Sequence, residues 1–444
     1  MTRPTTLAAW LAYLEMLHPK AIALGLERVR AVFERMGIVR PDGTAPDRTG
    51  MMLACPILTV TGTNGKGSTC ALLESMLLSA GHRTGLYTSP HLISYNERVR
   101  IGGEEVADDQ LIDAFNAVED ARADVPLTYF EYGTLAALWL FARAELDVVV
   151  LEVGLGGRLD AVNIVDADIA VVTSVDLDHM DYLGPTREDI GREKAGIFRA
   201  GRPVVCAEPS PPATMIAHAR VLAAPVTLIG RDYGYVTDGA QWEYWGPGGR
   251  RFGLPHPALR GAIQLVNAAT AIAALDLLRD HLHVSAGAVR DGLVSVQLAG
   301  RFQVLPGRPA VVLDVAHNPH AARVFAAALG TMGYHRETIA VFGIFADKDI
   351  AGVINAMRPR IDRWHVATLP GPRGAGAVAV RAELRRAGVA PEGISAFDDV
   401  GAAFRAARER AGEADRIIVF GSFLTVAAAL AAAKPGAART NRHG

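Results

Sequence analysis

The chain has 444 residues, half of them hydrophobic, and a formal net charge of −2. This length suits two domains, and the balanced charge argues against nucleic acid or an anionic membrane surface as the main partner. Three cysteines without disulfide-type or zinc-type spacing, Cys55, Cys70 and Cys206, favour a reducing, cytoplasmic setting.

Residues 7–37 show the apolar spacing of two helices. The first apolar run, residues 7–14, is interrupted by Glu15, so we expect neither a signal peptide nor a membrane anchor there. Between the two helices lies Ile22-Ala23-Leu24-Gly25-Leu26. On its pattern alone, this segment is best interpreted as a turn.

A glycine-rich segment lies between a predicted strand at 58–61 and a predicted helix at 71–78. Glycines there let backbone N–H groups converge on a phosphate, Lys66 reaches the β- and γ-phosphates, and Ser68 can place a hydroxyl on Mg²⁺. The general Walker pattern does not match, because Val60 and Gly67 stand where it requires Gly and Ser or Thr. The alternative is a turn without a ligand, but strand, loop, Lys and hydroxyls together favour ATP. The expected ATP-binding residues are Gly62, Thr63, Asn64, Gly65, Lys66, Gly67 and Ser68.

Three polar residues lie near or just after the ends of predicted strands at 83–88, 147–153 and 169–175. Ser89, Glu152 and His179 should therefore lie at the carboxyl edge of one sheet, where open α/β sheets bind ligands. A buried Glu152 needs a cation, and Mg²⁺ beside phosphates is the natural candidate. The alternatives are an internal salt bridge for Glu152 and a structural hydrogen bond for His179.

Lysine is rare in this chain, with five lysines among 45 basic residues. Lys66 and Lys194 both lie inside motifs, which suggests that a compact or deprotonatable amine is wanted there. The alternative for Lys194 is an ordinary position on the surface of a short helix.

The segment Thr128-Tyr129-Phe130-Glu131 precedes a predicted helix that runs to Phe141, with Thr128 as a possible cap. Tyr129 and Phe130 could stack on a flat heterocycle, although packing is the more common role of such rings. The pattern of residues 203–260 predicts peripheral β structure, and a helix is predicted to begin at Gln264. From Arg301 onward, strands and helices alternate as in a small doubly wound domain.

Five blocks of sequence carry a resemblance to a known family. They are TGTNGKGS at 61–68, LEVGLGGRLDA at 151–161, GREKAGIF at 191–198, GRF at 300–302 and DVAHNPHAA at 314–322. Together they resemble the bifunctional dihydrofolate synthase/folylpolyglutamate synthase family, the folate branch of the Mur ligase superfamily. The resemblance implies an α/β protein with a P-loop ATPase domain over 1–298 and a smaller Rossmann-like, glutamate-ligase domain over 299–444.

The implied reaction adds L-glutamate to dihydropteroate and to reduced folates, with ATP and an acyl-phosphate intermediate. We expect a monomer. The alternatives are an enzyme with only one of the two activities, an amide ligase acting on a cell-wall precursor, and a nucleotide-gated binding protein that forms no bond.

The resemblance also implies roles for individual residues. Ser89, Glu152 and His179 would bind two Mg²⁺ ions, Lys194 would be carbamylated, and His317 would act near the second chemical step unless it only hydrogen-bonds its loop. Asn267, Arg301 and Asp314 would contact the nucleotide. The implied dihydropteroate-binding residues are Ala23, Leu24, Gly25, Leu26, Thr128, Tyr129, Phe130, Glu131, Leu159, Asp160 and Ala161.

Position 23 departs from the family pattern. Ala23 stands where the family usually has Asp, so this chain binds the pterin with other groups there or binds it more weakly.

Overall fold

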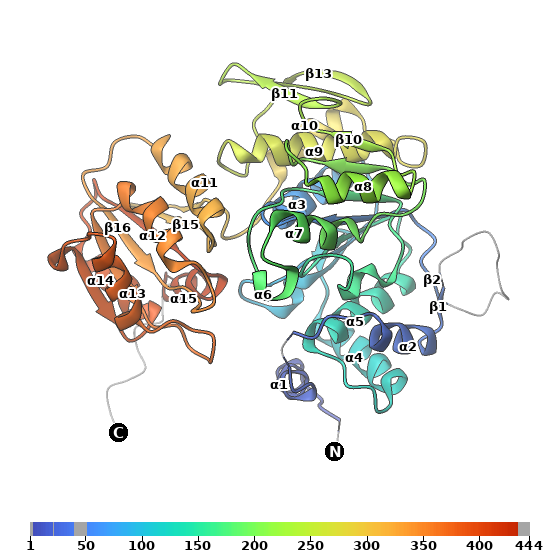
Figure 1. Ribbon diagram of the computed structural model, residues 1–444, viewed down its shortest axis with the longest axis horizontal. Coiled ribbons are helices and arrows are strands. Elements are labelled where there is room, and N and C mark those ends of the chain that lie inside the picture. Colours follow the sequence, from blue (N-terminus) through green and yellow to red (C-terminus); the bar gives the residue numbers. More distant parts are fainter. Residues whose placement is uncertain (1–2, 21, 40–50, 434–444) are drawn as a thin grey trace. The chain divides into compact units, whose positions relative to one another are not determined.

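The computed structural model describes residues 3–20, 22–39 and 51–433 (Figure 1). The chain divides into two compact units, Met1–Ala258 with Leu265–Val296, and Leu259–Gln264 with Gln297–Gly444. The predicted division into 1–298 and 299–444 differs from this one at residues 259–264 and 297–298.

Within its described residues, the first unit is built on an eight-stranded sheet with the order β10-β9-β8-β3-β7-β4-β5-β6. The strands from β10 to β4 are parallel, and β5 and β6 are antiparallel additions at one edge. In the central strand β3, Val60 pairs with Glu152 of β7 and Thr61 pairs with Val172 of β8. The P-loop, Glu152 and the residues after β8 therefore leave the sheet at the same edge. The strands are β3 (Ile57–Thr61), β4 (Thr84–Tyr87), β5 (Val99–Ile101), β6 (Glu104–Glu105), β7 (Val148–Glu152), β8 (Ile169–Val172), β9 (Val204–Cys206) and β10 (Val226–Leu228).

The helices of the first unit include the two predicted at the N-terminus, and residues 18–20 and 22–26 between them are described as loop. Several elements were not predicted, among them the short pair β1 (Ile38–Val39) and β2 (Met51–Met52), the edge strands β5 and β6, the helices α4 (Asp108–Arg122) and α10 (Ala286–Ser295), and α8 (Ala213–Val221) within the stretch predicted as β structure. The peripheral β structure itself is confirmed as the antiparallel sheet of β11 (Gly234–Thr237), β12 (Trp242–Gly246) and β13 (Gly249–Leu254). The other helices are α1 (Leu7–Leu17), α2 (Glu27–Arg35), α3 (Lys66–Ser79), η1 (Tyr95–Arg98), α5 (Tyr129–Arg143), η2 (Ala161–Ile164), α6 (Met180–Leu183), α7 (Arg187–Ala195) and α9 (Ile263–Leu277), which begins in the second unit.

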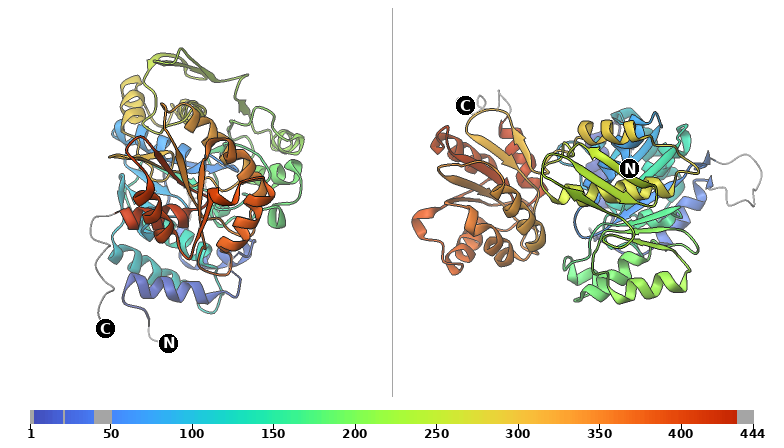
Figure 2. Two further views of the ribbon diagram at one scale, coloured as in Figure 1. Left: turned by 90° about the vertical axis from the view of Figure 1, so that its left-hand side faces the viewer. Right: turned by 90° about the horizontal axis from the view of Figure 1, so that it is seen from above.

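The second unit is a six-stranded sheet in its described part, with the order β14-β15-β19-β16-β17-β18. All neighbours are parallel except β14 and β15, and helices cover both faces (Figure 2). The predicted doubly wound domain is thus confirmed. Its elements are β14 (Gln303–Leu305), β15 (Ala310–Leu313), α11 (Pro319–Gly330), β16 (Thr338–Phe342), α12 (Ile350–Met357), η3 (Arg358–Arg360), β17 (Arg363–Ala367), α13 (Ala377–Arg386), η4 (Pro391–Gly393), β18 (Ile394–Phe397), α14 (Val400–Arg410), β19 (Arg416–Phe420) and α15 (Phe423–Ala433).

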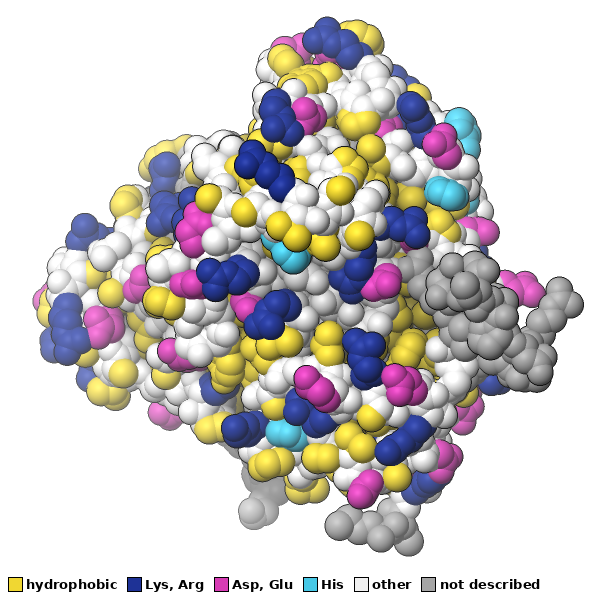
Figure 3. All heavy atoms as spheres, turned by 45° about the vertical axis from the view of Figure 1, so that its right-hand side comes forward, with side chains coloured by type: hydrophobic (Ala, Val, Ile, Leu, Met, Phe, Trp, Pro, Cys, Tyr) yellow, Lys and Arg dark blue, Asp and Glu magenta, His cyan; other side chains and the backbone are white. Residues whose placement is uncertain are grey.

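Charged side chains of both signs are interspersed with apolar ones over the face shown in Figure 3. None of the helices in the described ranges combines the length and apolarity that crossing a bilayer requires.

Candidate active site

The P-loop connects β3 to α3, which begins at Lys66, earlier than the apolar spacing alone predicts. Two of its glycines are required by conformation and by space. Gly62 has φ +154° and a Cβ there would lie 1.8 Å from Thr173 Oγ1, while Gly65 has φ +91° and a Cβ there would lie 2.9 Å from Asn267 Oδ1. Side chains at these two positions would displace their neighbours, so the loop needs glycine.

Residues directly after β8 hold the P-loop in place. The Thr63 N–H donates to the Ser174 carbonyl at 2.9 Å, and the Asn64 N–H donates to Ser174 Oγ at 2.9 Å. Thr173 Oγ1 donates to the Asn64 carbonyl at 2.6 Å. Thr173 and Ser174 were missed by the sequence reasoning, although a Thr-Ser pair ending a buried strand was a usable signal.

The start of α3 forms a site suited to an anion. The first N–H groups of a helix have no intrahelical acceptor, and the helix dipole adds positive charge there. Lys66 extends back over the loop, with Nζ 3.0 Å from the Gly62 carbonyl. Ser68 and Gly67 occupy the first turn of α3, and Asn267 of α9 packs against Gly65. The residues of the first unit that were predicted to bind ATP thus surround one loop.

Two of the three predicted metal ligands lie side by side. The Ser89 N–H donates to Glu152 Oε2 at 3.1 Å, and Glu152 is only 5% exposed. His179 lies beyond β8 in the left-handed region, with φ 52°, and its N–H donates to Asp178 Oδ1 at 2.9 Å. Left-handed backbone is uncommon for a residue other than glycine, so the 178–179 turn is a locally strained one.

The oxygen donors of Ser89 and Glu152 suit a metal ion that is bound together with a nucleotide. In the described part of the chain there is no group of three or more His, Cys, Asp or Glu that could hold a metal by itself. A hydroxyl at Ser89 beside a carboxylate at Glu152 offers hard oxygen donors and leaves ligand positions for phosphate oxygens and water. That is how Mg²⁺ is usually held next to a triphosphate.

Lys194, on α7, is buried, with 2% exposure. Burial and, to a smaller extent, the positive charge of Lys66 lower the pKa of its amine from 10.5 to about 7, while Asp178 and Asp160 oppose the shift. An amine with this pKa is neutral in a large fraction of molecules near pH 7. Lys194 is therefore not the surface lysine of the alternative interpretation.

The three segments predicted to bind dihydropteroate meet in space. The Gly25 N–H donates to the Leu159 carbonyl at 3.3 Å, which joins the first segment to the third. The Phe130 ring lies against Gly154, where a Cβ would be 2.7 Å from Phe130 Cζ, so the second segment also contacts the 154–161 loop. Thr128 caps α5, as predicted, by accepting the Glu131 N–H at 3.2 Å.

Asp160 links these segments to the P-loop electrostatically. It is 3% exposed, and burial raises the pKa of its carboxyl to about 7. The N–H groups of Leu155, at 2.8 Å, and Val162, at 3.1 Å, together with the charge of Lys66, oppose that shift. Hydrogen bonds and a nearby cation favour the charged form of this carboxyl, while burial favours the neutral form. Such opposing influences on one titratable group are typical of functional sites.

The remaining predicted residues lie in the second unit. Asp314 accepts the N–H groups of Phe302 at 2.9 Å and Ala316 at 2.8 Å, and burial raises the pKa of its carboxyl. Arg301 lies over the Phe423 ring, 5.0 Å from its centroid. His317 Nδ1 lies 2.9 Å from the Val315 carbonyl, which can only accept, so Nδ1 carries a proton and Nε2 is the acceptor nitrogen of the neutral ring.

Comparison with known families agrees with this geometry. Residues 60–232 match the Mur ligase middle domain, and residues 300–423 match the Mur ligase glutamate ligase domain. The chain is 47% identical over 421 residues to the dihydrofolate synthase/folylpolyglutamate synthase of Escherichia coli K12, covering 95% of this chain and 94% of that one. The protein of the same name from Haemophilus influenzae is 41% identical, covering 95% and 96%.

Solved structures give the same result. E. coli FolC in complex with DHPP and ADP has a TM-score of 0.88 at 47% identity and covers 96% of this chain and 97% of that one. A bifunctional folylpolyglutamate synthase/dihydrofolate synthase with Mn, AMPPNP and L-glutamate bound has a TM-score of 0.85 at 46% identity, covering 96% and 98%. Folylpolyglutamate synthase from Mycobacterium tuberculosis, complexed with ADP, has a TM-score of 0.85 at 27% identity, covering 97% and 99%. The chain therefore belongs to the dihydrofolate synthase/folylpolyglutamate synthase family of Mur ligases and is an ATP-dependent ligase.

Proposed function

We propose that this ligase joins L-glutamate both to dihydropteroate, giving dihydrofolate, and to reduced folates, giving folylpolyglutamates. The observation that carries the proposal is a direct contact between two loops: Thr61 Oγ1, at the start of the P-loop, donates to the Gly156 carbonyl at 2.6 Å. Through that contact, the loop on which three predicted substrate segments converge adjoins the loop predicted to hold the triphosphate, and the charge of Lys66 acts on Asp160 of the substrate loop. A carboxylate held by these segments can then approach the γ-phosphate.

The first step is phosphoryl transfer. An oxygen of the acceptor carboxylate forms a bond to the γ-phosphorus of ATP while the bond from that phosphorus to the β,γ-bridging oxygen breaks, which gives an acyl phosphate and ADP. Lys66 and the N-terminus of α3 stabilise the charge on the transferring oxygens. Ser89, Glu152 and His179 would hold Mg²⁺, expected as two ions, which neutralises phosphate charge when it is bound.

The second step is acyl transfer. The glutamate nitrogen forms a bond to the acyl carbon, the bond from that carbon to the phosphate oxygen breaks, and phosphate leaves. Starting from the ammonium form, the nitrogen loses two protons and keeps one as the amide N–H, and Nε2 of neutral His317 is the proposed acceptor for one of the two. Asn267, Arg301 and Asp314 are proposed to contact the nucleotide.

Lys194 is proposed to be carbamylated. Its neutral amine attacks CO₂, an N–C bond forms, and one proton is released, which leaves an anionic group where a lysine stood. The pKa of about 7 supports this step, because only the neutral amine reacts.

Single activity is the second candidate, favoured by one comparison. The Mycobacterium tuberculosis structure, named only as a folylpolyglutamate synthase, shares the fold at a TM-score of 0.85, so the fold by itself does not separate the two cases. The relatives at 47% and 41% identity carry both activities in their names, which supports the bifunctional proposal. Location in a reducing cytoplasm and a monomeric state remain predictions.

The test is ADP release by the purified protein with L-glutamate and ATP, given dihydropteroate or tetrahydrofolate. Stimulation by both acceptors supports the proposal. Stimulation by one acceptor alone would leave a single-activity enzyme, and stimulation by neither would remove the folate assignment.

A further inference from the structure

The side chain of Arg28 connects two of the three converging substrate segments, residues 22–26 and 128–131. We propose that Arg28 is a positioning residue: it fixes the 22–26 loop against the start of α5 and thereby sets the affinity for the acceptor substrate. This inference rests on the proposed function, since it concerns the same acceptor site.

The Arg28 guanidinium bridges two acceptors with one nitrogen. Nη2 donates to the Ala23 carbonyl at 2.7 Å and to Glu131 Oε1 at 2.7 Å. Nε lies 3.4 Å from Glu131 Oε2, which completes a two-point contact with the carboxylate. The side chain of Arg28 is 27% exposed and that of Glu131 is 5% exposed, so the pair is shielded from water on the α5 side. Charge-assisted contacts of this kind are stronger than neutral ones and fix direction as well as distance.

Glu131 is a firm anchor for this contact because it is fixed by its own helix. Oε2 of Glu131 accepts the Thr128 N–H at 2.7 Å, and Thr128 Oγ1 accepts the Glu131 N–H at 3.2 Å, which forms a capping box. Tyr129 and Phe130 lie in the sequence between the two partners of that box. Arg28 therefore ties the 22–26 loop to the same backbone that places the proposed stacking ring.

The loop is held again on its other side. The Gly25 N–H donates to the Leu159 carbonyl at 3.3 Å, and Gly25 adopts φ +142°, in the region that favours glycine. Ala23 has only a methyl side chain, so the polar groups that the loop can offer there are those of its backbone. The Ala23 carbonyl keeps a second lone pair beyond the one Arg28 engages. Hydrogen bonds weaken steeply with misalignment, so a flat polar heterocycle can hydrogen-bond to the 22–26 backbone only if that backbone is held in a fixed position.

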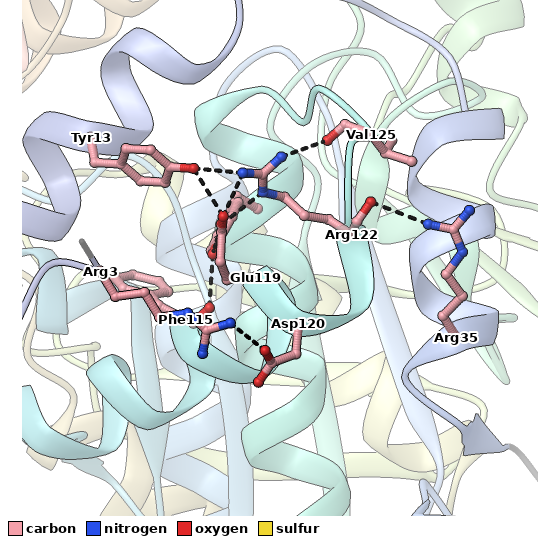
Figure 4. Close-up of polar contacts among 9 residues, drawn as sticks. Arg3, Tyr13, Arg35, Phe115, Glu119, Asp120, Arg122 and Val125 are labelled. Carbon is pink, nitrogen blue, oxygen red and sulfur yellow. Dashed lines mark hydrogen bonds and ion pairs between the residues drawn. The ribbon is translucent and has the colours of Figure 1, made fainter. Parts of the chain in front are cut away.

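The helix that carries Arg28 is docked independently of it. At its other end, Arg35 Nη1 donates to the Ala121 carbonyl at 3.3 Å and to the Arg122 carbonyl at 3.2 Å, at the C-terminus of α4. Figure 4 shows the contact with Arg122. On α2 itself, Val29 and Val32 are fully buried. Loss of Arg28 should therefore release the loop while α2 stays in place.

The experiment uses the full chain with Arg28→Gln, Arg28→Lys and, as a matched control on the same helix, Arg35→Gln. ADP release with L-glutamate gives KM for dihydropteroate and KM for ATP, and thermal unfolding gives Tm. Arg28→Gln should raise KM for dihydropteroate about tenfold or more and leave KM for ATP within about twofold. Arg28→Lys keeps a cation beside Glu131 but not the planar fork, so it should keep Tm and still raise KM for dihydropteroate several-fold.

The control separates positioning from stability, because Arg35→Gln should lower Tm and leave both KM values unchanged. If Arg28→Gln does not fold, Arg28→Lys still decides the question. An unchanged KM for dihydropteroate in the folded Arg28 variants, or an equal rise in both KM values, overturns the proposal for Arg28 alone. A wild-type protein whose ADP release neither acceptor stimulates overturns the proposed function as well.

Discussion

Lys194 and Lys66 lie near enough for their positive charges to interact, although they belong to different helices, α7 and α3. Lys66 is the residue proposed to meet the phosphates, and its charge adds to burial in lowering the pKa of Lys194 to about 7. The same lysine opposes protonation of Asp160 on the acceptor side. The charge of Lys66 therefore acts both on the lysine proposed to be carbamylated and on a carboxyl of the proposed acceptor site.

The first prediction concerns Lys194 and pH. A pKa lowered from 10.5 to about 7 means that the neutral amine, which reacts with CO₂, predominates above pH 7 and is lost as pH falls through that value. Carbon-13 NMR with labelled bicarbonate should show a carbamate signal that grows between about pH 6 and 8. Lys194→Arg keeps the charge without a neutral form, so it should show no signal and lose most activity. Near-normal turnover in that variant would remove the carbamate from the mechanism.

The second prediction concerns Glu152. Glu152→Gln keeps an oxygen that can accept the Ser89 N–H but removes the negative charge. Mg²⁺-dependent ADP release should fall about 100-fold or more while Tm changes little. The control is Glu188→Gln on α7, where the carboxylate accepts the N–H groups of Ala213 and Thr214 at an exposed site. Equal activities of the two variants over a Mg²⁺ titration would show that Glu152 does not bind the ion.

The third prediction concerns the space around Gly62. An alanine there would place Cβ 1.8 Å from Thr173 Oγ1 in a backbone conformation unfavourable to L residues. The clash should lower the free energy of unfolding by about 2–4 kcal/mol and weaken ATP binding. Gly81→Ala, with φ +87° and no heavy atom within 4 Å of the new Cβ, should cost only about 1 kcal/mol. Urea unfolding and nucleotide titration measure both effects, and similar values for the two variants would contradict the steric argument.

The fourth prediction concerns Glu74, a buried residue of α3. Burial raises the pKa of its carboxyl to about 7, although Arg100 lies 3.3 Å away and opposes the shift. Because the pKa of Glu74 is higher in the folded state than in the unfolded state, the protonated carboxyl contributes stability below the unfolded-state pKa of about 4.5. This contribution is lost as the pH rises to the folded-state pKa of about 7. The free energy of unfolding of Glu74→Gln, measured relative to that of the wild type, should therefore rise by on the order of 2 kcal/mol between pH 5 and pH 8. Glu34→Gln, at an exposed position, should show no such trend, and parallel pH profiles for Glu74→Gln and wild type would refute the shift.

The elements that carry continuous apolar, β-branched runs were predictable from the sequence. Strands β3, β7 and β8 of the first unit and β15, β16 and β19 of the second lie where such runs stand, because a strand buried on both faces cannot alternate with polar residues. Helix α8 was not predicted, since its nine residues follow a proline pair within a stretch rich in turn residues. Short helices depend on packing more than on their own propensity.

The site was predictable as a set of motifs but not as a set of contacts. The sequence placed Ser89 and Glu152 at strand ends, and the parallel register then brings them together. Arg28 and Glu131 stand 103 positions apart, and no local pattern joins them. The pKa of Lys194 likewise depends on burial and on Lys66, which only the tertiary structure supplies.

The central claim is that one chain activates a carboxylate with ATP and passes it to glutamate. The most direct test is to supply dihydropteroate with oxygen-18 in its carboxylate and to analyse the phosphate released with ATP and L-glutamate. We predict one labelled oxygen in each phosphate and formation of dihydrofolate, because the acyl phosphate breaks at its carbon–oxygen bond. Dihydrofolate accompanied by unlabelled phosphate, or no dihydrofolate at all, would contradict the account.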